Sequence, residues 1–167
     1  GRLLILDGLG ARLLRLEAGR LQVVFVFPAG ADPNAVEVAP DGRILLSDYA
    51  ARRVFVLSIA GEIQAIAGNG GVRASGDGGP AAEASFFQPL FLAHDDAGAL
   101  YVSDGGNGVV RRIGVDGSIE RVAGGGDGQE NSALDATLGR PAGLAFDGAG
   151  RLYMADEKTH RILRLEE

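Results

Sequence analysis

The sequence lacks several residue types that carry common chemistries. It contains no Cys and no Trp, and only one Met and one Lys. Without Cys the chain can form no disulfide framework, no thiolate zinc site and no cysteine nucleophile. Its longest uninterrupted apolar run, 23–27, is far shorter than the ~18 residues of a membrane-spanning helix. Acidic residues outnumber basic ones by 22 to 16, giving a net charge of −6. We therefore expect neither a membrane nor a nucleic acid as partner.

Glycine, in contrast, is present in excess. It accounts for 27 of 167 residues, whereas the average share in proteins is about 7%. The hydrophobic share of 46% and the charged share of 23% are those of an ordinary folded domain. We therefore expect a folded chain whose backbone turns unusually often.

Three stretches of the chain repeat one pattern. In each, a Pro is followed nine residues later by Gly and fifteen residues later by Asp, with an apolar triplet shortly before the Asp. The three sets are Pro33, Gly42 and Asp48; Pro89, Gly98 and Asp104; and Pro141, Gly150 and Asp156. The N-terminal segment matches the second half of the pattern, with Asp7 in the place of the Asp. This self-similarity indicates a repeat protein.

Each repeat contains four short apolar runs separated by turn residues. In the third unit they are 90–94, 100–103, 109–115 and 119–123. Such runs, bounded by Asp-Gly, Asn-Gly or Gly-rich turns, predict β-strands. The alternative of an amphipathic helix over 11–21 is rejected because its copy at 53–60 is β-branched and aromatic. We predict an all-β fold of four-stranded antiparallel blades, which is the unit of a β-propeller.

The repeats divide the chain into about four blades, two of them incomplete. Blade 1 (1–28) lacks its inner strand, blades 2 (33–70) and 3 (89–126) are complete, and blade 4 (141–167) lacks its outer strand. The fourteen predicted strands cannot close a ring by sharing one blade, because both ends carry the same two middle strands. Open ends would expose apolar blade faces. We therefore expect a homo-oligomeric ring, most simply two chains with eight blades. The alternative is a piece of a longer chain.

The repeated pattern closely resembles the NHL repeat. The matching stretches are P-x-x-L-A-x-D-x-x-G-x-L-Y-V-x-D, then R-V/I-x-R-I, then D-G-x-I-x-x-V-A-G. Segments 76–89 (GDGGPAAEASFFQP) and 126–141 resemble the inter-blade connections of bacterial NHL proteins, although none follows the first unit. The resemblance implies a bacterial NHL-type propeller, a fold that mostly serves as an interaction platform and occasionally as an enzyme. The sequence itself leaves the location unknown, and the family analogy alone suggests a secreted or periplasmic one.

Within the connections, 81–86 and 134–138 predict one helical turn each, with Phe86 or Phe87 as the anchor of the first. Asp77 and Asp127 are interpreted as side chains that hold these loops. The four repeated Asp residues are interpreted as structural, because an Asp that closes a strand accepts hydrogen bonds from the amides of the following turn.

The two histidines, His94 and His160, occupy non-equivalent positions in different blades, and we find no third metal ligand near either in the pattern. We therefore predict no catalytic residue, no metal site and no cofactor. His94, at the end of an inner strand, is retained as the candidate ligand-binding residue.

Three functions remain open. The first is a non-catalytic binding or scaffold module that binds a protein or small ligand at its channel face. The second is a fragment of an enzyme, such as a metal-dependent lyase or lactonase, with a site assembled from several blades. The third is a purely structural, self-assembling fragment.

Overall fold

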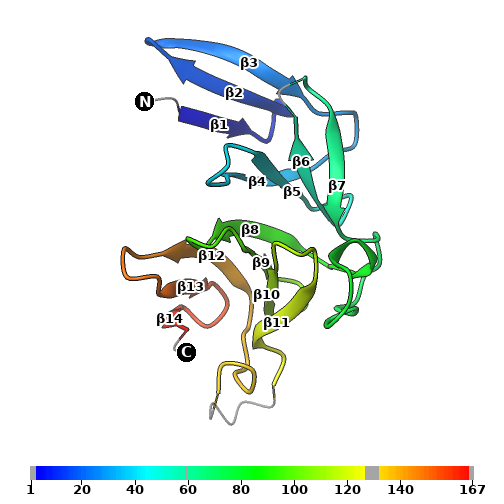
Figure 1. The fold of residues 1–167 in the computed structure, drawn as a ribbon, viewed down its shortest axis with the longest axis vertical. Coiled ribbons are helices and arrows are strands. Elements are labelled where there is room, and N and C mark those ends of the chain that lie inside the picture. Colours follow the sequence, from blue (N-terminus) through cyan, green and yellow to red (C-terminus); the bar gives the residue numbers. More distant parts are fainter. Residues whose placement is uncertain (1–2, 59, 127–131, 166–167) are drawn as a thin grey trace.

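The chain folds into a series of small antiparallel sheets. The structure, a computed structural model, describes residues 3–58, 60–126 and 132–165. These residues form fourteen strands in four sheets, which follow one another along an arc from the N-terminal to the C-terminal end (Figure 1). The predicted all-β class is confirmed.

Each sheet is a meander, in which consecutive strands are neighbours. Sheet 1 contains β1 (Leu3–Asp7), β2 (Arg12–Glu17) and β3 (Arg20–Val26). Sheet 2 contains β4 (Pro33–Val38), β5 (Ile44–Asp48), β6 (Arg53–Leu57) and β7 (Ile63–Ala67). Sheet 3 contains β8 (Pro89–His94), β9 (Leu100–Asp104), β10 (Val109–Ile113) and β11 (Ile119–Gly124). Sheet 4 contains β12 (Pro141–Phe146), β13 (Leu152–Asp156) and β14 (Arg161–Arg164).

The repeated Asp identifies equivalent strands. It ends the second strand of both complete sheets, as Asp48 on β5 and Asp104 on β9. Asp7 ends β1 and Asp156 ends β13. Within the described residues, sheet 1 therefore has no counterpart of the inner strand, and sheet 4 has none of the outer strand.

The hydrophobic core lies between the sheets. One cluster, which includes Leu13 and Leu46, fills the space between sheets 1 and 2. A second, around Phe86 and Val102, joins sheets 2 and 3, and a third, around Val110 and Met154, joins sheets 3 and 4. Alternation along each strand sends successive side chains to opposite faces. Sheets 2 and 3, which have a neighbouring sheet on both sides, therefore each contribute to two clusters.

Two local expectations need correction. The third strand of sheet 3 ends at Ile113 and not at 115, because Gly114 and Ser118 close a hydrogen-bonded turn in which Gly117 has a φ of 82°. A helical turn forms at Ala81–Glu83 as predicted. Around 134, however, the chain makes a simple turn in which the Asp135 N–H donates to the Ser132 carbonyl.

Candidate functional site

The repeated Asp residues bind backbone amides. Asp48 accepts hydrogen bonds from Ala51 N–H (2.7 Å), in the turn after β5, and from Asp32 N–H (3.2 Å), just before β4. The equivalent contacts are made by the amides of Phe87 and Gln88 to Asp104, and by those of Gly139 and Arg140 to Asp156. These carboxylates thus tie the connection between sheets to the second strand, a contact that the turn-based interpretation did not include.

Two of these carboxylates differ electrostatically. Burial raises the pKa of Asp104 above its ordinary value, although Asn107, Gln88 and Phe87 all donate to it. For Asp156 burial also acts upward, but hydrogen bonds from the amides of Arg140 and Gly139 and from Thr159 together outweigh it, so that the pKa of Asp156 is lowered. Hydrogen bonds to the charged form and loss of water act in opposite directions on a carboxylate.

The connection between sheets 2 and 3, residues 68–88, is fastened by Arg111 on β10. This arginine is fully buried. Its guanidinium contacts Asp77 Oδ1 (2.8 and 2.9 Å) and donates to the carbonyls of Ser75 and Ser85, both at 2.8 Å. It also lies 4.9 Å from the ring centroid of Phe86. Asp77 therefore holds its loop, whereas Asp127 lies outside the described residues.

Phe86 is the buried anchor of this connection, and Phe87 remains partly exposed. The loop also joins the sheets through its backbone, since Gly68 N–H donates to Ala81 O and Ile119 N–H donates to Gly79 O. The interface between sheets 2 and 3 is thereby filled from its outer side.

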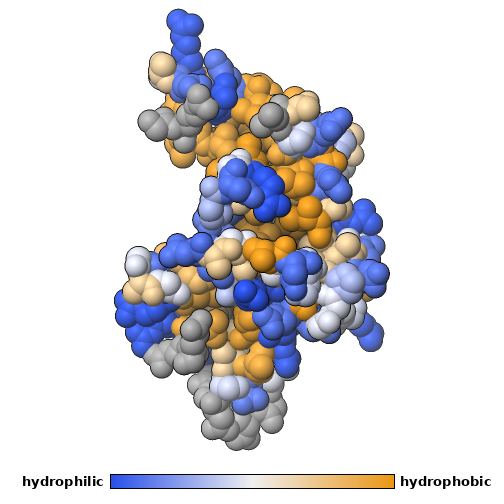
Figure 2. Space-filling view, viewed as in Figure 1, coloured by the Kyte–Doolittle hydropathy of each residue, from blue (hydrophilic) through white to orange (hydrophobic). Residues whose placement is uncertain are grey.

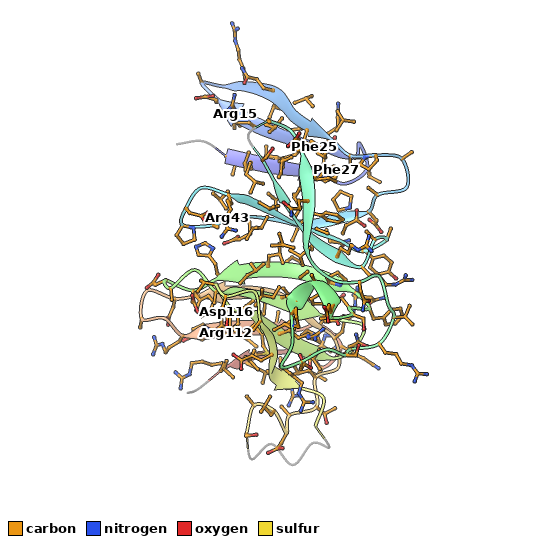
Figure 3. The ribbon with its side chains drawn as sticks, turned by 45° about the vertical axis from the view of Figure 1, so that its right-hand side comes forward. Arg15, Phe25, Phe27, Arg43, Arg112 and Asp116 are labelled. Atoms are coloured by element: carbon orange, nitrogen blue, oxygen red, sulfur yellow. The ribbon has the colours of Figure 1, made fainter. Side chains whose placement is uncertain are left out.

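The connection between sheets 1 and 2 is short, residues 27–32, and it lines a pocket of about 290 Å³ together with residues of sheet 2. Its lining is mainly apolar and includes Phe27, Pro28, Ala31, Leu46, Ala51 and Phe55. The ring of Phe27 packs edge-on against that of Phe25, with the centroids 5.1 Å apart (Figure 3).

Phe55 occupies in β6 the place that Arg111 occupies in β10. Both follow the anchoring Asp by seven residues, and both directly follow a shift in register between the third and fourth strands. An aromatic side chain thus stands where the next sheet has the arginine that binds a long connection. Both the short connection and Phe55 line the pocket.

The polar groups beside the pocket are already hydrogen-bonded. The Ser47 hydroxyl accepts from Ala35 N–H (3.1 Å) and donates to Leu90 O (3.0 Å). The Asp48 carboxylate binds two amides, as described above. A ligand in this pocket would therefore be held through apolar contact.

His94 lies at the end of β8 and contacts Glu37 of β4, with 2.5 Å between Nδ1 and Oε1. Each side chain is 27% exposed. The structure thus brings the candidate histidine together with a carboxylate of the neighbouring inner strand. His160 lies elsewhere, in the turn between β13 and β14.

Within the described ranges, no three His, Asp or Glu side chains are grouped closely enough to hold a metal ion. In the same part of the chain, no helix is long and apolar enough to cross a membrane.

Comparisons with known proteins establish the fold. No protein-family model matches the chain, and no curated protein matches it. Many solved structures do, and these neighbours are β-propeller proteins. The four sheets are therefore blades of a propeller, which confirms the predicted fold class.

Three of these structures show the range of neighbours. A protein of unknown function from Bacteroides thetaiotaomicron has a TM-score of 0.84 at 21% identity, over 98% of this chain and 44% of its own. An auxiliary nutrient binding protein from the same organism has a TM-score of 0.77 at 14% identity, over 99% and 46%. A gluconolactonase from Xanthomonas campestris has a TM-score of 0.73 at 20% identity, over 98% and 53%. The chain thus spans about half the length of these propellers.

Proposed function

We propose that this chain is a non-catalytic binding module of NHL-propeller type. In this proposal it forms part of a propeller ring and receives a small apolar ligand, such as a flat aromatic group, in the pocket between the connection 27–32 and sheet 2. The observation that carries the proposal is the pocket itself, with Phe27 and Phe55 in its lining. Its volume of about 290 Å³ lies at the lower end of the range for ligand pockets.

The connections support the same function. Binding residues are expected on the loops that differ between blades, because the residues shared by all blades pack the core. Here the short connection 27–32 and Phe55 distinguish one interface from the next. The similarity to an auxiliary nutrient binding protein agrees with a binding role but shows only a shared fold.

Ligand-observed NMR with indole as the probe tests this function. We expect saturation transfer from the protein to indole, and loss of most of this transfer in Ala31→Leu, which adds three carbons to the pocket lining. Ala149→Leu, at an exposed turn far from the lining residues in sequence, is the matched control and should bind indole unchanged. Equal transfer in wild type and Ala31→Leu would overturn the proposal.

A lactonase-like enzyme, or a fragment of one, is the second candidate. It is favoured by the similarity to a gluconolactonase and by the contact between His94 and Glu37. Metal analysis of the purified protein, followed by a lactone hydrolysis assay of wild type and His94→Ala, tests it. A tightly held divalent metal, together with hydrolysis that depends on His94, would support it, and no hydrolysis by the metal-supplemented protein would exclude it.

A further inference from the structure

Sheet 1 exposes an apolar face at one end of the arc. Opposed residues of antiparallel neighbours point to the same side of a sheet, so the register places one set of side chains away from sheet 2. These residues, the end face of sheet 1, are Leu3, Ile5, Leu14, Leu16, Leu21 and Val23. Leu3, Leu21 and Val23 are 54–59% exposed. Figure 2 shows hydrophobic residues reaching the surface in this part of the molecule. Exposed apolar patches of this kind mark interaction sites.

The contact between sheets 3 and 4 shows how such a face is normally covered. Leu152, Met154 and Leu163 of sheet 4 pack in one cluster with Val110 and Tyr101 of sheet 3. The aromatic ring of Tyr101 also meets that of Phe146 edge-on, with 5.0 Å between the centroids. The interface between sheets 3 and 4 therefore serves as the template for how two blades of this chain pack against each other.

The end face of sheet 1 reproduces the side that sheet 4 contributes to this template. Counted from the anchoring Asp, Leu3, Ile5, Leu14 and Leu16 take the places of Leu152, Met154, Leu163 and Leu165. The register agrees, because Ile5 lies opposite Leu14 as Met154 lies opposite Leu163.

The outer face of sheet 4 reproduces the other side of the template. Tyr153, Ala155, Ile162 and Arg164 correspond to Tyr101, Ser103, Val110 and Arg112 of sheet 3. Ile162, at the place of the buried Val110, is 72% exposed. The outer face of sheet 4 therefore resembles the face of sheet 3 that sheet 4 covers. A sheet 1 that packs on this outer face would meet a surface similar to the one that sheet 4 meets on sheet 3.

We propose that the end face of sheet 1 packs against the outer face of sheet 4 of a second copy of this chain. Two such contacts, related by a two-fold axis, close a ring of eight blades, which is within the known range of about 4–8. The proposal rests on the proposed function only in treating the chain as part of a ring. The chain itself covers about half the length of each compared propeller.

Light scattering after size exclusion tests the number of chains. We expect a mass of two chains for the wild type. Leu14→Asp should weaken the dimer by roughly 100-fold, since it places a charge in an apolar contact. Leu9→Asp, at a fully exposed turn, is the control and should leave the dimer intact. A wild-type monomer, or an open-ended series of larger assemblies, would overturn the proposal.

Cross-linking tests which faces meet. The chain has no Cys, so that a short bismaleimide can join only introduced thiols. We expect a mixture of Leu14→Cys and Ile162→Cys copies to cross-link, and Leu14→Cys alone not to. Cross-linking of Leu14→Cys alone would contradict this pairing. Indole binding is measured separately on the same samples, so that failure of the ring and failure of the pocket are distinguished.

Discussion

The interfaces on the two sides of sheet 2 are built from the same repeat but differ at their outer side. Toward sheet 3, a long connection crosses the outer side of the interface and Arg111 fastens it. Toward sheet 1, the connection is short and Phe55 lines an open pocket at the place equivalent to that arginine. At these two interfaces, an arginine at this third-strand position accompanies a long connection and a closed outer side, whereas a phenylalanine accompanies a short connection and a pocket.

The closed interface should depend strongly on its arginine. Arg111→Ala leaves the carbonyls of Ser75 and Ser85 and the Asp77 carboxylate without their donor, and we expect a loss of about 3–5 kcal/mol in unfolding free energy. Urea denaturation measures it. Arg112→Ala, which removes a partly exposed arginine paired with Glu120, should cost less than about 1 kcal/mol. Similar losses for both variants would show that Arg111 does not fasten the connection.

The carboxylates that hold the connections should respond to pH in opposite directions. The pKa of Asp156 is lowered in the folded protein, so its contribution is present above the ordinary Asp value and is lost as the pH falls through the folded pKa. We expect Asp156→Asn to cost about 1–3 kcal/mol at neutral pH and progressively less in acid.

Asp104 supplies the contrast. The pKa of Asp104 is raised in the folded protein. Protonated Asp104 therefore adds to the unfolding free energy at low pH, and this stabilisation is lost as the pH rises through the folded pKa. The stability difference between wild type and Asp104→Asn should therefore shrink with rising pH. Parallel pH profiles for the Asp156→Asn and Asp104→Asn variants, measured by urea denaturation, would contradict this comparison.

The open interface should tolerate filling. Ala31→Leu places apolar atoms in the pocket, and we expect a gain of about 0.5–2 kcal/mol in unfolding free energy. Thermal denaturation of this variant beside Ala149→Leu, which should change stability by less than about 0.5 kcal/mol, gives the measurement. A clear destabilisation by Ala31→Leu would mean that the pocket lining cannot accommodate extra volume.

The contact between His94 and Glu37 joins the inner strands on the closed side of sheet 2. Both side chains retain some exposure, and such pairs contribute only about 0.2–1 kcal/mol. Glu37→Gln should therefore have the smallest effect of these variants on urea denaturation. A loss of unfolding free energy as large as that of Arg111→Ala would contradict this prediction.

The repeat made the fold readable from the sequence. The spacing from Pro to Asp located the inner and second strands, and short apolar runs located the rest, because each strand is local and ends at a Gly or Asp turn. The exact end of β10 was missed, since Val115 continues the apolar pattern beyond the turn that Gly117 permits.

The site was much less readable. Arg111 stands beside Arg112 in a strand that reads VVRRI, where the sequence does not tell which arginine is buried. The side chain of Arg111 is covered by a loop more than twenty residues earlier. The proximity of His94 to Glu37 depends on how two blades pack, which no local pattern encodes. The pocket has one signal in the sequence, the short connection after the first unit, but its lining required the structure.

The placement of the core between sheets also bears on how such a chain evolves. Each blade has one face toward the preceding blade and one toward the following blade. The packing of sheets 3 and 4 uses the same types of residue that lie on the free faces at the two ends of the arc. Duplication of one unit therefore creates a new interface without any compensating substitution, and loss of a unit exposes surfaces that still fit one another. A gene of this kind can change its length by whole blades, much as solenoid repeats do, and selection can then act on the connections separately from the blades.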